Sequence, residues 1–154
     1  WFLQGGAYFF ITNILLVLFI TATAINPDSF NLIILFISLI PLGPSLSALS
    51  ASTSEILREK SISFSSYFFK SYKDNFVSSL KLWLIILLML SLMFVDFQYF
   101  FLNIPRYGIH VIFEILAIYI ALLSLYAIPI NSRFEMKIKD VFILSSYYII
   151  KKLP

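Results

Sequence analysis

Four long apolar runs constrain this chain more than any other feature of its sequence. They cover about residues 7–25, 32–51, 80–95 and 109–130. A helix needs about 20 apolar residues to cross the hydrocarbon core of a bilayer. The chain is 60% hydrophobic and only 12% charged, which leaves more apolar surface than a soluble domain of 154 residues can bury. We therefore expect an all-α, polytopic transmembrane helical bundle that forms one membrane domain over residues 1–154.

The distribution of basic residues predicts the orientation of these four spans. Every Lys and Arg except Arg106 lies in one of two segments, between the second and third runs or after the fourth. Cytoplasmic loops of membrane proteins are enriched in Lys and Arg. We therefore expect both segments, and the N-terminus, on the cytoplasmic side.

Each basic segment contains a stretch that is too polar or too short to cross a membrane. We expect two cytoplasmic interfacial helices, over about residues 62–79 and 137–152. In the first, aromatic residues recur every fourth position, which is typical of an amphipathic helix lying on a membrane surface. Anchoring in lipid and docking of a partner both remain open for this candidate docking helix, which comprises Phe64, Phe68, Lys70, Tyr72, Lys73, Asn75 and Phe76.

The second apolar run contains a break, in the sequence "IPLGPSLSALSAS". Pro41 and Pro44 each remove a backbone donor, and Gly43 relaxes the backbone further, so we expect a kink near mid-membrane. Ser45 is expected to cap the restarting helix. The small residues that follow would let another helix approach closely, and broken helices with such flanks also form substrate sites in transporters. We call them the small-residue face: Ser47, Ala48, Ser50, Ala51 and Ser52.

The few polar residues near the third and fourth spans form the second candidate site. His110 and Glu114 are four positions apart, so they can face one way on a helix, and Asp96 and Arg106 lie in the hairpin before them. This outer polar cluster could close the hairpin through ion pairs. Alternatively, Glu114 could form a substrate or proton site, because a carboxylate within a span is costly and often functional.

The sequence offers no constellation that we expect to catalyse a reaction. His110 and Glu114, in a chain without cysteine, are too few ligands for a closed zinc site. There is also no nucleophile–base pair, phosphate loop or glycine-rich dinucleotide turn. We expect no enzymatic activity, no catalytic residue, no metal and no cofactor. Nucleic-acid binding is not expected either, because membrane topology accounts for the basic residues.

Several short motifs in order resemble those of the YesL-like family of small bacterial membrane proteins. They are Asn13 and Leu15 in "TNILLVLF", Gly43 and Pro44 in "IPLGPSLSAL", and the segment "FSSYFFKSYKDNFVSSLKLWLIILLMLSLMFVDFQYF" that closes on Asp96. The resemblance covers roughly residues 12–101. It implies a multi-pass protein of the bacterial cytoplasmic (plasma) membrane. Because family members typically carry one more span, it also implies a further span beyond Pro154.

The functional implication of the resemblance is a role in carbohydrate uptake. Genes of this family tend to lie beside carbohydrate ABC importers and glycan-degrading enzymes. We therefore expect a non-catalytic accessory subunit that binds the permease of such an importer through the small-residue face, with the ATPase or the binding protein as further partners. Two alternatives are a stand-alone carrier with a path at the broken second helix and Glu114, and a membrane sensor partner for sugar signalling.

Overall fold

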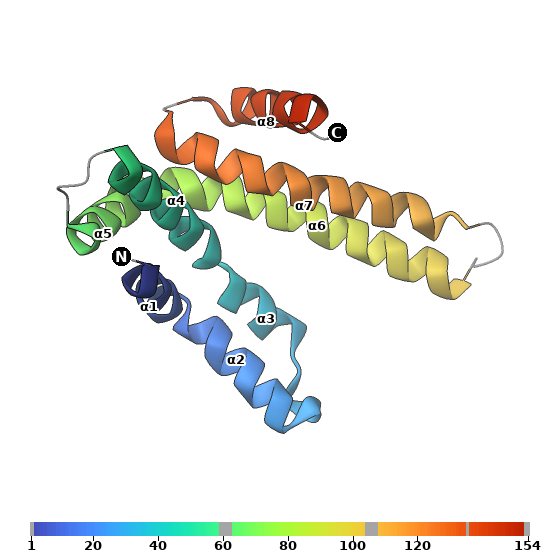
Figure 1. The fold of residues 1–154 in the computed structure, drawn as a ribbon. Coiled ribbons are helices and arrows are strands. Elements are labelled where there is room, and N and C mark those ends of the chain that lie inside the picture. The colour runs from blue at the N-terminus through green and yellow to red at the C-terminus, as the bar shows by residue number, and fades with distance from the viewer. Residues whose placement is uncertain (1, 59–62, 104–107, 135, 153–154) are drawn as a thin grey trace. The chain divides into compact units, whose positions relative to one another are not determined.

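The computed structural model describes residues 2–58, 63–103, 108–134 and 136–152, and these residues form helices and no strands. The all-α class expected from the sequence is thus confirmed (Figure 1). In chain order the elements are α1 (Phe2–Thr12), α2 (Ile14–Ile25), the 3-10 turn η1 (Pro27–Ser29), α3 (Leu32–Leu39), α4 (Leu42–Arg58), α5 (Phe64–Asp74), α6 (Phe76–Asn103), α7 (His110–Arg133) and α8 (Ile138–Lys152).

Three stretches are long and apolar enough to cross a membrane. They are Leu32–Arg58, which combines α3 and α4, and the helices α6 and α7. The helices α1 and α2 together would make a fourth span, but they are bent by 74° at Asn13. The four predicted spans therefore correspond to real apolar helices, and the first of them is broken at a point that the sequence analysis did not predict.

The sequence predicts one membrane domain. In the structure the contacts within the chain divide it into two compact units, Trp1–Lys81 and Leu82–Pro154. In the first unit, α1 and α2 run against α3 and α4 as a hairpin (Figure 1). Asparagines stabilise the turn at its tip. The Asn26 side chain accepts a hydrogen bond from the Asp28 N–H, and the Asn31 side chain caps α3 by accepting from the Ile33 N–H at 2.9 Å.

Helix α5 packs against α4 and α1 in the first unit. Its aromatic face forms the centre of a small core with Ala48 of α4, and both Phe64 (3% exposed) and Phe68 (0% exposed) are buried there. The sequence left open whether this face anchors in lipid or docks a partner. In the structure the two rings pack on Tyr8 of α1 and on α4 within the same chain. Helix α5 also ends at Asp74, and α6 begins at Phe76 rather than after residue 79.

The second unit contains the rest of α6, α7 and α8. Ring contacts join the facing ends of α6 and α7, with the Phe100 and Phe113 centroids 5.2 Å apart. Helix α8 lies along α7, where the Tyr119 hydroxyl donates to Ser146 Oγ at 3.0 Å and Tyr126 stacks on Tyr148. One face of α8 is buried, through Val141, Ser145 and Ile149. This element was expected as the second interfacial helix over residues 137–152.

Candidate functional site

Two helix breaks lie next to each other in the first unit. One is at Asn13, between α1 and α2, and the other is at Ile40–Pro41, between α3 and α4. Contacts join α1 to α4, and a pair of hydroxyls links the breaks directly, with Ser45 Oγ 2.9 Å from Thr12 Oγ1. We refer to Thr12, Asn13, Pro41 and Ser45 as the polar junction.

The break at Pro41 follows from the missing donor of proline, as predicted. In a continuous helix the N–H of residue 41 would bond to the Ile37 carbonyl. In its place the Ile40 N–H donates to that carbonyl at 3.2 Å, in a tighter 3-10 turn. The carbonyl freed by Pro41 is therefore satisfied within the same helix, without a neighbouring helix or a solute.

Pro44 does not break the helix, because it occupies the first turn of α4. The first intrahelical bond of α4 runs from the Ser45 N–H to the Pro41 carbonyl at 3.1 Å. Residues in the first turn of any helix have no helical partner for a backbone N–H, so the missing N–H of Pro44 removes no helical bond. The expectation that Ser45 caps this helix is wrong. Its hydroxyl lies 2.7 Å from the Pro41 carbonyl oxygen and faces α1, rather than accepting from a free N–H.

The break at Asn13 is sharper and is stabilised by its own side chain. The Asn13 Nδ2 atom donates to the Phe9 carbonyl at 2.8 Å, and it lies 3.4 Å from Thr12 Oγ1. The residue is 2% exposed. Among the described residues, its Oδ1 atom has no hydrogen-bond partner. The junction therefore holds a buried acceptor, which is costly to leave unpaired.

The small-residue face is occupied inside the chain. Ser47, Ala48 and Ser52 are at most 1% exposed, and Ala51 is 7% exposed. Ser79 Oγ, at the start of α6, donates to Ser47 Oγ at 2.7 Å, and Ala48 packs on Phe64 and Phe68. Gly43, Pro44 and Ser45 are buried as well. Most of the face is thus already buried within the chain, and Ser50 remains half-buried, which leaves little of it open to a permease.

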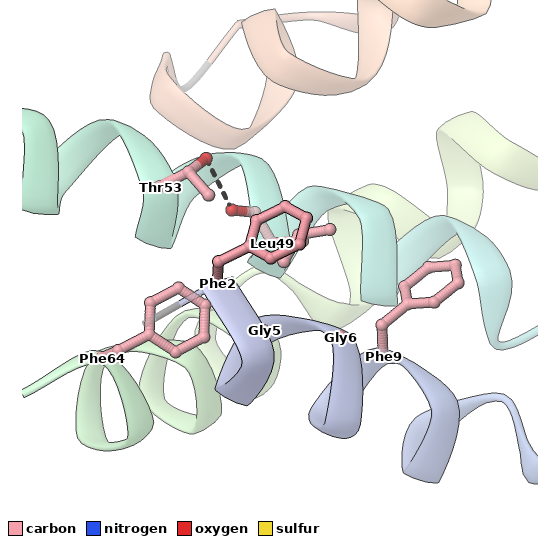
Figure 2. Close-up of a pocket in the computed structure, with 7 residues that line it drawn as sticks. All are labelled: Phe2, Gly5, Gly6, Phe9, Leu49, Thr53 and Phe64. Atoms are coloured by element: carbon pink, nitrogen blue, oxygen red, sulfur yellow. Dashed lines mark hydrogen bonds between the residues drawn. The ribbon is translucent and has the colours of Figure 1, made fainter.

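A recess remains open beside this core (Figure 2). It has a volume of about 370 Å³, and its lining comes from α1, α4 and α5. Gly5 and Gly6 sit side by side on α1 but differ in surroundings. A Cβ at Gly5 would meet Phe64 Cζ at 3.0 Å, whereas a Cβ at Gly6 would meet nothing within 4 Å. The lining is almost wholly apolar and comprises Phe2, Gly5, Gly6, Phe9, Leu49, Thr53 and Phe64.

The candidate docking helix presents two different faces. Lys70 and Lys73 are exposed, whereas Phe64 and Phe68 are buried in the core. Tyr72 and Phe76 continue the ring contacts toward α6, with centroids 5.6 Å apart, and Asn75 joins the two helices by donating from Nδ2 to Ser71 Oγ at 3.3 Å. Burial raises the pKa of the Tyr72 hydroxyl above its ordinary value.

The outer polar cluster is described only in part, for Asp96, His110 and Glu114. Arg106 lies outside the described residues. The His110 ring contacts Phe97 and Phe101, with centroids 6.1 and 5.4 Å away, and Glu114 is exposed on α7. Among the described residues, no three His, Asp or Glu side chains gather into a group that could hold a metal ion. Asp96, His110 and Glu114 belong to the second unit, and the break in the second span belongs to the first.

Residues that the sequence analysis did not select complete the candidate site. Thr12 and Asn13 form the bend in the first span, Tyr8 closes the aromatic core, and its hydroxyl lies 2.6 Å from Ser65 Oγ. Two signals were available: the polar pair Thr12–Asn13 inside an apolar run, and the motif of Asn13 and Leu15 on which the family resemblance partly rests. Gly6 carried no signal, because a glycine beside open space and a glycine in a tight contact look the same in sequence.

Comparison with known proteins places most of the first unit in a family. Residues 9–97 match the sequence profile described as "Protein of unknown function, DUF624". This range includes the polar junction, α5 and the Ser47–Ser79 contact, but not Gly6 or Glu114. No curated protein and no solved structure matches the chain. Because the matched range covers more than half of the 154 residues, the chain belongs to the family of proteins of unknown function DUF624.

Proposed function

We propose that this protein is a non-catalytic accessory subunit that binds the permease of a bacterial carbohydrate ABC importer within the membrane. The proposal is supported by the resemblance to YesL-like proteins, whose genes tend to lie beside such importers. The family match over residues 9–97 covers nearly the same range as that resemblance. The ATPase and the binding protein of the importer are further candidate partners.

The recess beside Gly6 is the observation that carries this proposal. A glycine inside a helix costs about 1 kcal/mol relative to alanine, and nothing in the described structure requires one here, because a Cβ would meet no atom within 4 Å. Small residues at such positions let a second transmembrane helix approach closely. An apolar side chain from a permease helix would fill the apolar lining of the recess. We therefore propose the recess, and not the small-residue face, as the permease contact, because most of the small-residue face is already buried.

The proposed location is the bacterial plasma membrane, with a cytoplasmic N-terminus. Ten of the eleven basic residues lie between the second and third spans or after the fourth, on one side of the membrane, and this asymmetry supports the orientation. Single cysteines test it, because the chain has no native cysteine. Ser29→Cys, at the tip of the first hairpin, should react with a membrane-impermeant thiol reagent from outside intact cells. Ser66→Cys, on the exposed side of α5, should react only after the membrane is opened.

Co-purification in mild detergent tests the proposed partner. The tagged wild-type chain should bring down the permease and its ATPase from native membranes. Gly6→Leu fills the recess and should reduce the recovered permease at least about tenfold, which corresponds to a loss of about 1.4 kcal/mol. Ala121→Leu introduces the same side chain at an exposed position of α7 and should leave recovery unchanged. If the wild-type chain never brings down a permease, the proposed function is wrong.

A second function, a small stand-alone carrier, is favoured by one observation. Two broken helices meet at a buried polar junction, as broken helices do at substrate sites of transporters. If the protein is a carrier, it should move a solute when reconstituted alone in liposomes, and Asn13→Leu should abolish that movement. Glu114→Gln should also abolish movement if Glu114 belongs to the path.

A further inference from the structure

Among the described residues, one buried hydrogen-bond acceptor of the polar junction, Asn13 Oδ1, has no partner, and Asn13 makes no side-chain cap bond to α2. A hydroxyl carries a single proton. The Thr12 proton has acceptors in the Tyr8 carbonyl at 2.9 Å and the Phe9 carbonyl at 3.1 Å. The Ser45 proton has acceptors in the Pro41 carbonyl and in Thr12 Oγ1. None of these groups donates to Asn13 Oδ1, which is buried.

The orientation of the Asn13 amide follows from its partners. Its Nδ2 atom faces the Phe9 carbonyl at 2.8 Å, and exchanging the two terminal atoms would place two oxygens against each other. The unpaired atom is therefore an oxygen, and the missing group is a donor.

The charges around the junction favour a neutral ligand. None of Thr12, Asn13, Pro41 and Ser45 is ionisable. Each break brings together the C-terminus of one helix and the N-terminus of the next, so the partial charges of the helix ends offset each other. A small cation would need several oxygens free to coordinate it, and the Tyr8, Phe9 and Pro41 carbonyls already accept bonds.

We infer that the polar junction binds the O–H group of a small neutral ligand, which donates to Asn13 Oδ1. A hydroxyl fits better than an amide, because its oxygen can also accept from Ser45 whenever the Ser45 proton turns away from Pro41. The O–H group comes either from a bound water or from an alcohol group of a solute. The inference depends on the junction alone and not on the proposed partner.

NMR spectroscopy of the full chain in nanodiscs separates the two sources. A bound water gives a cross-peak from the water frequency to the Thr12 methyl group and to the Asn13 side-chain amide. A solute alcohol gives saturable shifts of the same two signals on titration with glycerol. Asn103 is the matched control, because its Nδ2 atom makes the same 2.8 Å bond to the carbonyl four residues earlier at an exposed site. Either response confined to the junction supports the inference, and the absence of both overturns it.

Thermal unfolding gives an independent measurement. Asn13→Leu should lower the Tm, because the variant loses the amide–carbonyl bond and the bound ligand together. An Asn13→Leu protein at least as stable as the wild type overturns the inference, since it would mean that the variant removes an unpaired acceptor. A wild-type Tm that rises when sodium replaces choline at constant ionic strength also overturns it, because the ligand would then be a cation.

Discussion

Replacement of Phe68 by alanine tests whether the aromatic face of α5 packs on protein or on lipid. The ring is 0% exposed and has four aromatic neighbours, with centroids 5.5–6.3 Å away: Tyr8, Phe64, Phe69 and Tyr72. A Phe→Ala change in a protein core costs about 3–5 kcal/mol, including the void that it leaves. Each aromatic pair adds about 0.5–1.5 kcal/mol beyond buried area. We therefore expect a loss near the upper end, about 4–5 kcal/mol in the free energy of unfolding.

Removing a ring that faces lipid should cost much less, because lipid tails are as apolar as the removed side chain and take its place. Phe94 on α6 is 53% exposed and serves as the control, and its replacement by alanine should cost less than about 1 kcal/mol. Unfolding of the purified protein by increasing mole fractions of SDS in mixed micelles, followed by circular dichroism, measures both variants. If Phe68→Ala and Phe94→Ala shift the midpoint equally, the aromatic core around Tyr8 does not form and the fold described for the first unit is wrong.

Three further substitutions probe the first unit by the same unfolding measurement. Gly5→Ala should destabilise the protein, because the new Cβ would lie 3.0 Å from Phe64 Cζ and 3.1 Å from Leu49 Cδ1. Gly6→Ala should stabilise the free chain by about 1 kcal/mol, because its Cβ would meet nothing. Equal effects of the two substitutions would contradict the placement of α1. Ser47→Ala and Ser79→Ala should each cost about 1 kcal/mol and should be non-additive, because the two hydroxyls bond to each other at 2.7 Å; strict additivity in the double variant would exclude that bond. The raised pKa of Tyr72 means that the fold prefers the neutral phenol, so the contribution of Tyr72 to stability is complete below the pKa of an unfolded tyrosine and is lost as the pH rises through the folded pKa. The free energy of unfolding of Tyr72→Phe should therefore fall less than that of the wild type at alkaline pH. Identical pH profiles would show that burial does not affect the Tyr72 hydroxyl.

The features that could be predicted from the sequence are those that depend on neighbouring residues. Apolar runs long enough to span a bilayer give helices because the backbone must satisfy its own hydrogen bonds in lipid. The break at Pro41 was predictable for the same reason, because a proline removes a donor whatever surrounds it. Even so, the consequence at Pro44 was missed, since its effect depends on where the new helix begins.

The features that could not be predicted concern the partner of each apolar surface, which can be lipid, another helix of the chain or another protein. A stripe such as Phe64 and Phe68 is equally suited to lipid and to a protein core, because both are apolar, and only the fold decides that Tyr8 and Ala48 lie against it. The small-residue face has the same ambiguity between a helix of its own chain and a helix of another chain. An asparagine does not by itself require a bend, and the 74° angle occurs where α1 also packs on α4 and α5, which the local sequence does not reveal.

That angle also limits how deeply the N-terminal segment can reach into a bilayer. At a rise of about 1.5 Å per residue, the 11 residues of α1 and the 12 of α2 are about 16 and 18 Å long. With a bend of 74°, α1 adds only about 4–5 Å along the axis of α2, so that the pair extends about 23 Å in that direction. The hydrocarbon core is about 30 Å thick. Unless the bilayer thins locally around it, α2 stops short of one interface and α1 runs nearly level with the membrane plane. The recess beside Gly6 is lined by this level segment, so its position in the bilayer depends on the same bend.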